Sequence, residues 1–538
     1  MTSTAPPAPA PASPPGGAID PALRRIAGVV VLGIIMSILD TTIVIVAVDT
    51  LGREFETTLS AIQWVSTGYL LALSTVIPLS GWAVERFGAK RMWMLSLVLF
   101  VLGSVLCGLA WDATSLIVFR VLQGFGGGMI MPIGMSILAR EAGPARMGRM
   151  MSVVGVPALL APVLGPVIGG VLVDNLSWRW IFFVNVPVGI IALVLAARVL
   201  PSGEKASSAR LDVVGLALVS PGLAAVVYGL SEAGSSGSLT SPRVVAGVVI
   251  GLVLIAAFAV HALRTREPLM DLRLYRNRTF TVASLTSAAV GAVLFGAMFV
   301  LPLYYQVVRG SSALEAGLML APQGLGAMLA MPISGRLVDR IGAGRVVPFG
   351  IVAIVAGTLL FTAVTPSTPF ALLAGSLFLR GIGMGFVMMP AMAAAYLHLS
   401  RAEVPRATTM VNIVQRVGGS IGTALFAVVL ERTIASDVGG AAVGGSDSLG
   451  VSLVGSPAAA AVADAFGTTF WWVVGATLLA LIPSVFLPRV GADAATAPAP
   501  RSPERSAPAD AEREAEVEGA AIDDLTMGTP LAGASERS

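Results

Sequence analysis

The sequence predicts an all-α membrane protein built from two six-helix bundles plus two additional central transmembrane helices. Three observations predict this fold class. Of the 538 residues, 55% are hydrophobic and only 12% are charged, whereas soluble domains carry about 25% charged residues. Apolar stretches long enough to cross a bilayer alternate with short polar turns. A motif that follows the second stretch also recurs after the tenth.

The apolar stretches number fourteen, and each is long enough for a membrane-spanning helix, because about 20 residues cross a bilayer core of about 30 Å. Short polar turns separate them. In chain order the expected helices cover approximately residues 26–48, 61–82, 92–111, 114–139, 150–173, 179–200, 212–231, 243–263, 280–303, 315–337, 346–365, 369–396, 405–430 and 467–488.

A weak internal repeat divides the chain. The segment Gly81 to Gly88 reads GWAVERFG, and Gly335 to Gly342 reads GRLVDRIG, at an offset of 254 residues. Six helices need fewer residues than that offset, so the seventh and eighth stretches are interpreted as an inserted pair. Parallel halves that flank a site near the midplane are typical of secondary transporters.

The two ends of the chain differ in composition from the apolar stretches. The first twenty residues contain six prolines and no basic residue, and the tail from Arg489 onward holds ten acidic and five basic residues. Both ends are therefore expected to be disordered. The predicted division is an N-terminal tail 1–25, a first bundle 26–200, an inserted pair 201–279, a second bundle 280–488 with an extracytoplasmic loop 431–466, and an acidic tail 489–538.

The basic residues predict the topology. Of the 34 lysines and arginines, twenty-six fall on the side of the two termini, five fall on the opposite side, and three lie inside spans. The positive-inside rule therefore predicts a cytoplasmic-membrane protein with both termini in the cytoplasm. Short basic clusters between apolar runs serve topology, so we expect no nucleic-acid partner.

Several kinds of chemistry are excluded. A single cysteine, Cys107, leaves no partner for an internal disulfide, and the two histidines, His261 and His398, are too far apart in sequence to form a histidine metal cluster. No phosphate-binding loop of the GxxxxGK[ST] type is present, so the chain cannot use ATP by that route. We expect no enzyme activity and no cofactor, and an ion gradient as the source of energy.

Asp40 and Arg120 are the predicted proton-coupling residues. Asp40 lies about 21 Å from the cytoplasmic end of its span, and Arg120 lies about 9 Å from the opposite face, at 1.5 Å per residue. The two therefore lie at similar depth in a core of about 30 Å. An acid beside a guanidinium inside a membrane can change its protonation with small rearrangements. The alternative is a fixed buried pair that only orients two helices.

The fifth stretch is predicted to bend and to act as a gate. Each of its prolines removes a backbone donor and frees the carbonyl four residues earlier, and its small residues permit close helix contact. Ordinary packing is the alternative. The residues concerned are Pro157, Pro162, Gly165, Pro166, Gly169 and Gly170.

The repeated loop motif is predicted to control conformation. An acid precedes an arginine at the same place in both halves, and such an acid could bond across the loops or lie at a helix N-terminus. Simple topological anchoring is the alternative. The residues are Gly81, Glu85, Arg86 and Gly88 in the first half, and Asp339 and Arg340 in the second.

Polar and aromatic residues within spans form the predicted substrate pocket. Sparse hydrogen-bonding groups among methionine and aromatic side chains suit a bulky apolar ligand. For Arg380 and Arg416, packing and substrate contact are equal alternatives. The predicted pocket residues are Gln63, Trp64, Tyr69, Gln123, Tyr305, Gln306, Gln323, Asn412, Gln415 and Arg416.

These motifs together resemble the major facilitator superfamily, in its fourteen-span drug:proton antiporter branch, over residues 26–488. The resemblance rests on Leu39 to Val44, on the loop motif at Gly81, on Arg120 to Gly126, and on Gly165 to Gly170. The fourth-span arginine of the family is associated with proton transfer, and the fifth-span motif is characteristic of antiporters. The chain departs from the family at Glu85, where aspartate is usual, and at Ile45, where asparagine is common.

The resemblance implies a proton-driven antiporter that exports a hydrophobic drug or antibiotic, such as the aromatic polyketide tetracenomycin C, and confers resistance. Its expected partners are that small molecule, protons and the lipid bilayer, and we expect a monomer. Two alternatives remain at this stage: an uptake symporter of the same fold, and a membrane sensor that does not transport.

Overall fold

A computed structural model describes residues 20–57, 59–143, 146–201, 210–236, 238–397, 399–400, 402–438 and 458–489. The acidic tail beyond Arg489 and most of the predicted N-terminal tail lie outside these residues. The part of the tail that is described, from Pro21 onward, is helical instead of disordered. Pro21 is favoured at the start of a helix, and the Asp20 side chain caps it by accepting a hydrogen bond from the Ala22 amide at 3.2 Å.

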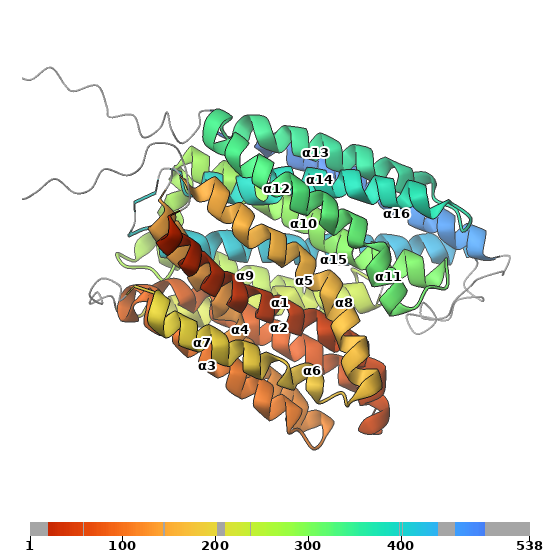
Figure 1. The fold of residues 1–538 in the computed structure, drawn as a ribbon, viewed down its shortest axis with the longest axis horizontal. Helices are drawn as coiled ribbons and strands as arrows, with labels where there is room; N and C mark the ends of the chain where they lie inside the picture. The colour runs from red at the N-terminus through yellow and green to blue at the C-terminus, as the bar shows by residue number, and fades with distance from the viewer. Residues whose placement is uncertain are drawn as a thin grey trace, which may run out of the picture. The chain divides into compact units, whose positions relative to one another are not determined.

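The described secondary structure is helical throughout (Figure 1). The α-helices are α1 (Pro21–Glu54), α2 (Leu59–Phe87), α3 (Ala89–Gly108), α4 (Ala113–Ala142), α5 (Met147–Asn175), α6 (Trp180–Phe183), α7 (Asn185–Val199), α8 (Val213–Ser236), α9 (Pro242–Arg264), α10 (Arg278–Val307), α11 (Ala313–Met319), α12 (Ala321–Ile341), α13 (Ala343–Leu359), α14 (Phe370–Ala395), α15 (Val404–Val438) and α16 (Ala458–Ser484). Two short 3-10 helices, η2 (Leu272–Arg276) and η3 (Leu360–Ala363), complete the set.

Among the described residues, thirteen helical segments are long and apolar enough to cross a membrane. In this set α6 and α7 form one segment, and α11 and α12 form another. The 29-residue α5 lies between the fourth and fifth of them in the chain and matches the remaining predicted helix. The predicted all-α membrane fold is confirmed.

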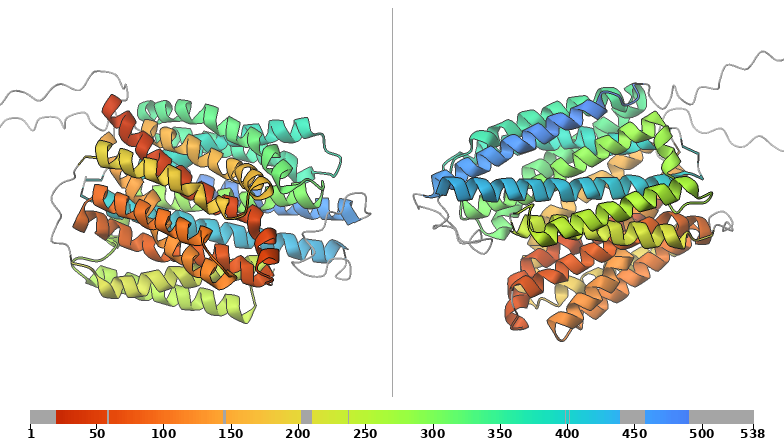
Figure 2. Two further views of the ribbon diagram at one scale, coloured as in Figure 1. Left: turned by 60° about the horizontal axis from the view of Figure 1, so that its bottom comes forward. Right: turned by 180° about the vertical axis from the view of Figure 1, so that it is seen from behind.

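The helices form two bundles with a pair between them in sequence. In the first bundle α4 packs on α2 and α3, and α1 packs on α4, α5 and α7; in the second, α10 packs on α15, and α14 packs on α12 and α13. The inserted helices α8 and α9 pack on each other, and α8 also contacts α2 and α15, one helix from each bundle. Figure 2 shows this yellow-green pair running along both halves.

The predicted extracytoplasmic loop 431–466 is wrong at both ends. Helix α15 continues to Val438, and α16 begins at Ala458. The run Ala458–Ala461 has the highest intrinsic helix propensity, and Ile434 is buried at 2% exposure, which anchors the end of α15. Residues 439–457 lie outside the described part of the chain.

The sequence repeat has a counterpart in the backbone. Gly88 and Gly342 each separate two consecutive helices, with φ angles of 87° and 81°. Side chains rarely tolerate this left-handed region, whereas glycine enters it freely. The last glycine of the repeated motif therefore makes the same sharp reversal in both bundles.

Candidate functional site

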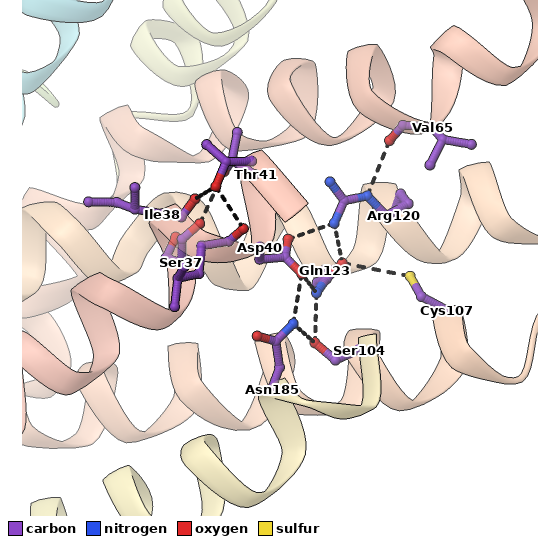
Figure 3. A network of polar contacts seen from close by, with 12 residues as sticks. Ser37, Ile38, Asp40, Thr41, Val65, Ser104, Cys107, Arg120, Gln123 and Asn185 are labelled. Carbon is purple, nitrogen blue, oxygen red and sulfur yellow. Dashed lines mark hydrogen bonds and ion pairs between the residues drawn. The ribbon is translucent and has the colours of Figure 1, made fainter. Parts of the chain in front are cut away.

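Asp40 is at the centre of a buried polar network in the first bundle (Figure 3). Its side chain is 0% exposed. The Oδ2 atom accepts a hydrogen bond from Nη1 of Arg120 at 2.6 Å. The Oδ1 atom accepts hydrogen bonds from Nε2 of Gln123 and Nδ2 of Asn185, both at 2.8 Å. Helices α1, α4 and α7 therefore meet at one carboxylate.

A second layer of contacts fixes the amide of Gln123. Its Nε2 also donates to Oγ of Ser104 at 2.6 Å, and its Oε1 accepts from Nη1 of Arg120 at 2.7 Å. The thiol sulfur of Cys107 lies 3.7 Å from the same Oε1. Ser104 and Cys107 bring α3 into the network, so four helices are tied to the protonation state of one acid.

Arg120 contacts a backbone carbonyl and two aromatic rings in addition to Asp40. Its Nε donates to the backbone carbonyl of Val65 at 3.2 Å. Its guanidinium carbon lies 4.1 Å from the ring centre of Tyr69 and 5.7 Å from that of Phe182. A desolvated cation over aromatic faces gains roughly 2 kcal/mol. The cation thus has a fixed position beside the acid.

The hydrogen-bond pattern determines what protonation does. An ionised carboxylate only accepts hydrogen bonds, whereas a protonated carboxyl group carries a donor and has less acceptor capacity. Asp40 accepts three hydrogen bonds, all from N–H donors. Adding a proton must therefore weaken or break at least one of the links from α1 to α4 or α7.

The glycines of α5 pack on α1 immediately after Asp40. A Cβ atom on Gly169 would lie 2.9 Å from Cγ1 of Ile43, and one on Gly165 would collide with Thr42, whereas one on Gly170 would meet nothing within 4 Å. Near the other end of α5, a Cβ on Gly155 would lie 2.8 Å from Met331 of α12. Helix α5 therefore contacts both the helix of Asp40 and the second bundle.

The backbone of α5 is continuously helical from Met147 to Asn175. Pro157 is partly buried, while the side chains of Pro162 and Pro166 lie outside the described residues. The hinge assigned to these three prolines stays a prediction.

The repeated motif is helical in the structure and not a loop, because α2 continues to Phe87 and α12 to Ile341. Its first copy joins the two bundles at the predicted cytoplasmic side. Oε2 of Glu85 lies 2.8 Å from Nη2 of Arg406 on α15. Nearby, the hydroxyls of Ser80 and Thr409 lie 2.9 Å apart, and a Cβ on Gly81 would lie 3.1 Å from the Thr409 hydroxyl. In the second motif Asp339 is buried, and the arginines of the two motifs, Arg86 and Arg340, are exposed.

The predicted pocket residues have different surroundings. Tyr69 and Gln123 belong to the Asp40 network. Trp64 stacks on Tyr228 of the inserted helix α8 at 6.1 Å, and Tyr305 packs on Tyr304 at 5.3 Å between ring centres. Gln63 is exposed, Gln415 is buried and Arg416 is half-buried. The side chain of Gln306 donates to the carbonyl of Pro302, that of Asn412 donates to the carbonyl of Thr408, and that of Gln323 accepts from Arg380. Their assembly into one pocket stays a prediction.

Ser104, Cys107 and Asn185 of the Asp40 network, and Arg406 beside Glu85, are not among the predicted site residues. Serine and cysteine are common in membrane helices, and an arginine at the end of a span is explained by topology alone. The one available signal was Asn185, because an amide inside an apolar span requires a polar partner.

Comparison with known proteins agrees with this architecture. The sequence profile of the Major Facilitator Superfamily matches residues 30–423. The chain is 47% identical over 415 residues, 77% of each chain, to the multidrug resistance protein B homolog of Mycobacterium tuberculosis. It is 31% identical over 397 residues, 73% of this chain and 77% of the relative, to the multidrug export protein EmrB of Escherichia coli strain K12.

A solved structure of the proton:xylose symporter XylE shares the fold, with a TM-score of 0.61 and 13% identity, covering 88% of this chain and 97% of that one. The human organic anion transporter MFSD10 gives a TM-score of 0.57 at 16% identity, over 86% of this chain and 100% of that one. At these identities the likeness concerns the fold alone. With the profile match and the 47% identical relative, the chain belongs to the Major Facilitator Superfamily.

Proposed function

We propose that this protein is a proton-driven exporter of apolar drugs or antibiotics across the cytoplasmic membrane. The observation that carries the proposal is the buried Asp40 carboxylate, which accepts hydrogen bonds from Arg120, Gln123 and Asn185. The names of the multidrug relatives support the export of drugs. The family membership supports transport in place of catalysis.

The proposed cycle begins when Asp40 takes a proton from the outer side. Protonation weakens its hydrogen bonds and frees α1 to move relative to α4 and α7. Because Gly165 and Gly169 of α5 pack on the turn of α1 that follows Asp40, movement of α1 is passed to α5 and to the second bundle. The proton leaves to the cytoplasm, and the substrate leaves to the outside in the opposite conformation.

The proposed substrates are apolar and aromatic, and tetracenomycin C is the compound we would test first. The twenty-one methionines of the chain provide adaptable apolar contact, which tolerates different ligand shapes. Such walls discriminate weakly between similar apolar molecules. This favours a broad substrate range. A monomer with both termini in the cytoplasm is the arrangement proposed.

The test uses everted membrane vesicles that contain the protein. An acid interior should drive accumulation of tetracenomycin C, and an uncoupler should abolish it. Asp40→Asn should remove the accumulation. The matched control is Asp112→Asn, because Asp112 caps α4 outside the span and asparagine caps equally well. Full gradient-driven accumulation by Asp40→Asn would disprove the assigned role, and loss of substrate from the vesicles would indicate uptake instead of export.

A further inference from the structure

Arg380 is an arginine buried in the second bundle with most of its donors unused. It lies in α14 and is 1% exposed. Its Nη1 donates to Oε1 of Gln323 on α12 at 2.9 Å. Its Nε and Nη2 are buried and have no hydrogen-bond partner among the described residues. A buried donor without a partner destabilises the protein, and more so when the donor is charged.

The contrast with Arg120 is informative because α4 and α14 share a loose sequence repeat. Both helices carry a phenylalanine, an arginine and a Met-Pro pair in the same order, at Phe119–Pro132 and at Phe378–Pro390. Arg120 has an acid, a carbonyl and an aromatic face as partners. In the second bundle, the position 254 residues after Asp40, which is the offset of the repeat, is Leu294. Leu294 is apolar and buried at 5% exposure. The second bundle has therefore kept a buried arginine without the acid.

A further feature makes the missing negative charge costly. One and two turns along α14 from Arg380, Met384 and Met388 line an apolar cavity with Leu294 and Ile354, and a charge interacts strongly in such low-dielectric surroundings. Uncompensated charge inside a membrane is rare and marks functional sites.

We propose that Arg380 of α14 and Gln323 of α12 form an anion subsite. The ligand is the carboxylate, sulfonate or phenolate group of an otherwise apolar molecule, or a small inorganic anion. The guanidinium binds the anion through Nε and Nη2, while Nη1 remains on Gln323. If the anion is part of the substrate, the inference rests on the proposed export function. The subsite then makes the protein selective for apolar anions over neutral molecules of the same shape.

The test compares two fluorescent probes that differ by one charged group. The anion is anilinonaphthalene sulfonate, and the neutral analogue is phenylnaphthylamine, which lacks the sulfonate. Binding is measured on the full chain in lipid nanodiscs, with empty nanodiscs as the blank. Arg380→Gln should weaken binding of the sulfonate by roughly tenfold to a hundredfold and leave binding of the neutral probe unchanged. Arg309→Gln is the matched control, because Arg309 bonds to the carbonyl of Thr368 at 2.6 Å outside this subsite.

Arg380→Lys keeps the charge and loses the fork of donors, so it should lose only part of the sulfonate affinity. This second variant, together with retained binding of the neutral probe, shows that folding is intact. Equal effects of Arg380→Gln on both probes, or none on either, would contradict a substrate-anion subsite.

The source of the anion is distinguished by exchanging chloride for gluconate. A preference for the sulfonate probe that depends on Arg380 shows that the bound anion is part of the substrate. The anion is inorganic if both probes bind equally and chloride raises the Tm in a way that Arg380→Gln removes. The absence of both effects overturns the proposal. Binding needs no gradient, so a failure here is separate from a failure of the Asp40→Asn export test.

Discussion

Oε2 of Glu85 and Nη2 of Arg406 lie 2.8 Å apart and join α2 of the first bundle to α15 of the second. Both side chains are mostly buried, at 14% and 23% exposure, so solvent screens their attraction less than it would at the surface. The hydroxyl pair of Ser80 and Thr409 lies beside them. These contacts hold the two bundles together at one end, and they must separate if that end is to open.

Glu85→Gln should shift the conformational equilibrium toward the state that is open at this end. Loss of roughly 1 kcal/mol of attraction changes the ratio of states about fivefold. Spin labels at exposed Arg91 of α3 and exposed Arg345 of α13, one in each bundle, should report longer distances in a Cys107→Ser background.

The charge swap Glu85→Arg with Arg406→Glu is the control for that measurement. It should restore the distances of the parent protein, because the attraction is recovered with its sign reversed. Unchanged distances in Glu85→Gln would mean that the ion pair does not hold the two bundles.

Gly169→Ala should impair export, whereas Gly170→Ala should not. A methyl group on Gly169 would lie 2.9 Å from Cγ1 and 3.0 Å from the carbonyl oxygen of Ile43, but one on Gly170 would meet nothing within 4 Å. Overpacking of this kind destabilises by about 1 to 3 kcal/mol. Export rates and Tm measured for both variants at matched expression check the prediction, and equal behaviour of the two would contradict close α1–α5 packing.

The sequence predicted the helices and the central pair for a physical reason. Charged residues inside a membrane span are rare, so Asp40 and Arg120 stand out, and the helical rise gives their depth. The depth of a residue in the membrane does not determine which way its side chain points around the helix axis, or which helices lie beside it. Ser104 and Asn185 enter the network only because of how α3 and α7 pack, which no local pattern determines.

The same limit explains the other differences. Arg406 and Glu85 are 321 positions apart. A charged residue at the end of a span can serve topology or form an ion pair, and the sequence does not distinguish the two roles. The sequence predicts too long a loop at 431–466 because small residues such as alanine are common in loops and in helices alike. Residue type alone does not predict which polar side chains share one pocket, because the direction of each side chain depends on the rotation of its helix.

Asn185→Leu should destabilise the protein through Asp40. The substitution keeps the side chain near its original size, but it removes the 2.8 Å hydrogen bond to Oδ1, and hydrogen bonds to charged groups contribute about 1.5 to 3 kcal/mol. Thermal unfolding in detergent should show a lower Tm, and gradient-driven export should fall. Ser104→Ala, which leaves all three donors to Asp40 in place, should have the smaller effect. The reverse order would mean that Ser104 and not Asn185 positions the acid.

Asp212 provides a pH-dependent contribution to stability where α8 begins. Burial alone would raise the pKa of Asp212, but hydrogen bonds from the Gly215 amide, the His261 side chain and the Leu269 amide together hold the pKa below its usual value of 3.8. Its Oδ1 lies 2.8 Å from Nε2 of His261 on α9. The ionised acid therefore ties α8, α9 and the following linker together.

Because the folded-state pKa is lowered, this stability is fully present above the unfolded value of 3.8 and is lost as the pH falls below it toward the folded value. Asp212→Asn keeps an acceptor and removes the charge, so at pH 7 it should lower the free energy of unfolding by about 1 to 2 kcal/mol. The difference in Tm between the variant and the parent protein should shrink as the pH is lowered below 3.8. Asp271→Asn, which changes an acid whose side chain caps η2, is the control and should show a smaller difference at pH 7. A Tm difference for Asp212→Asn that stays constant down to acid pH would show that the shape of the side chain, and not its charge, holds the inserted helices in place.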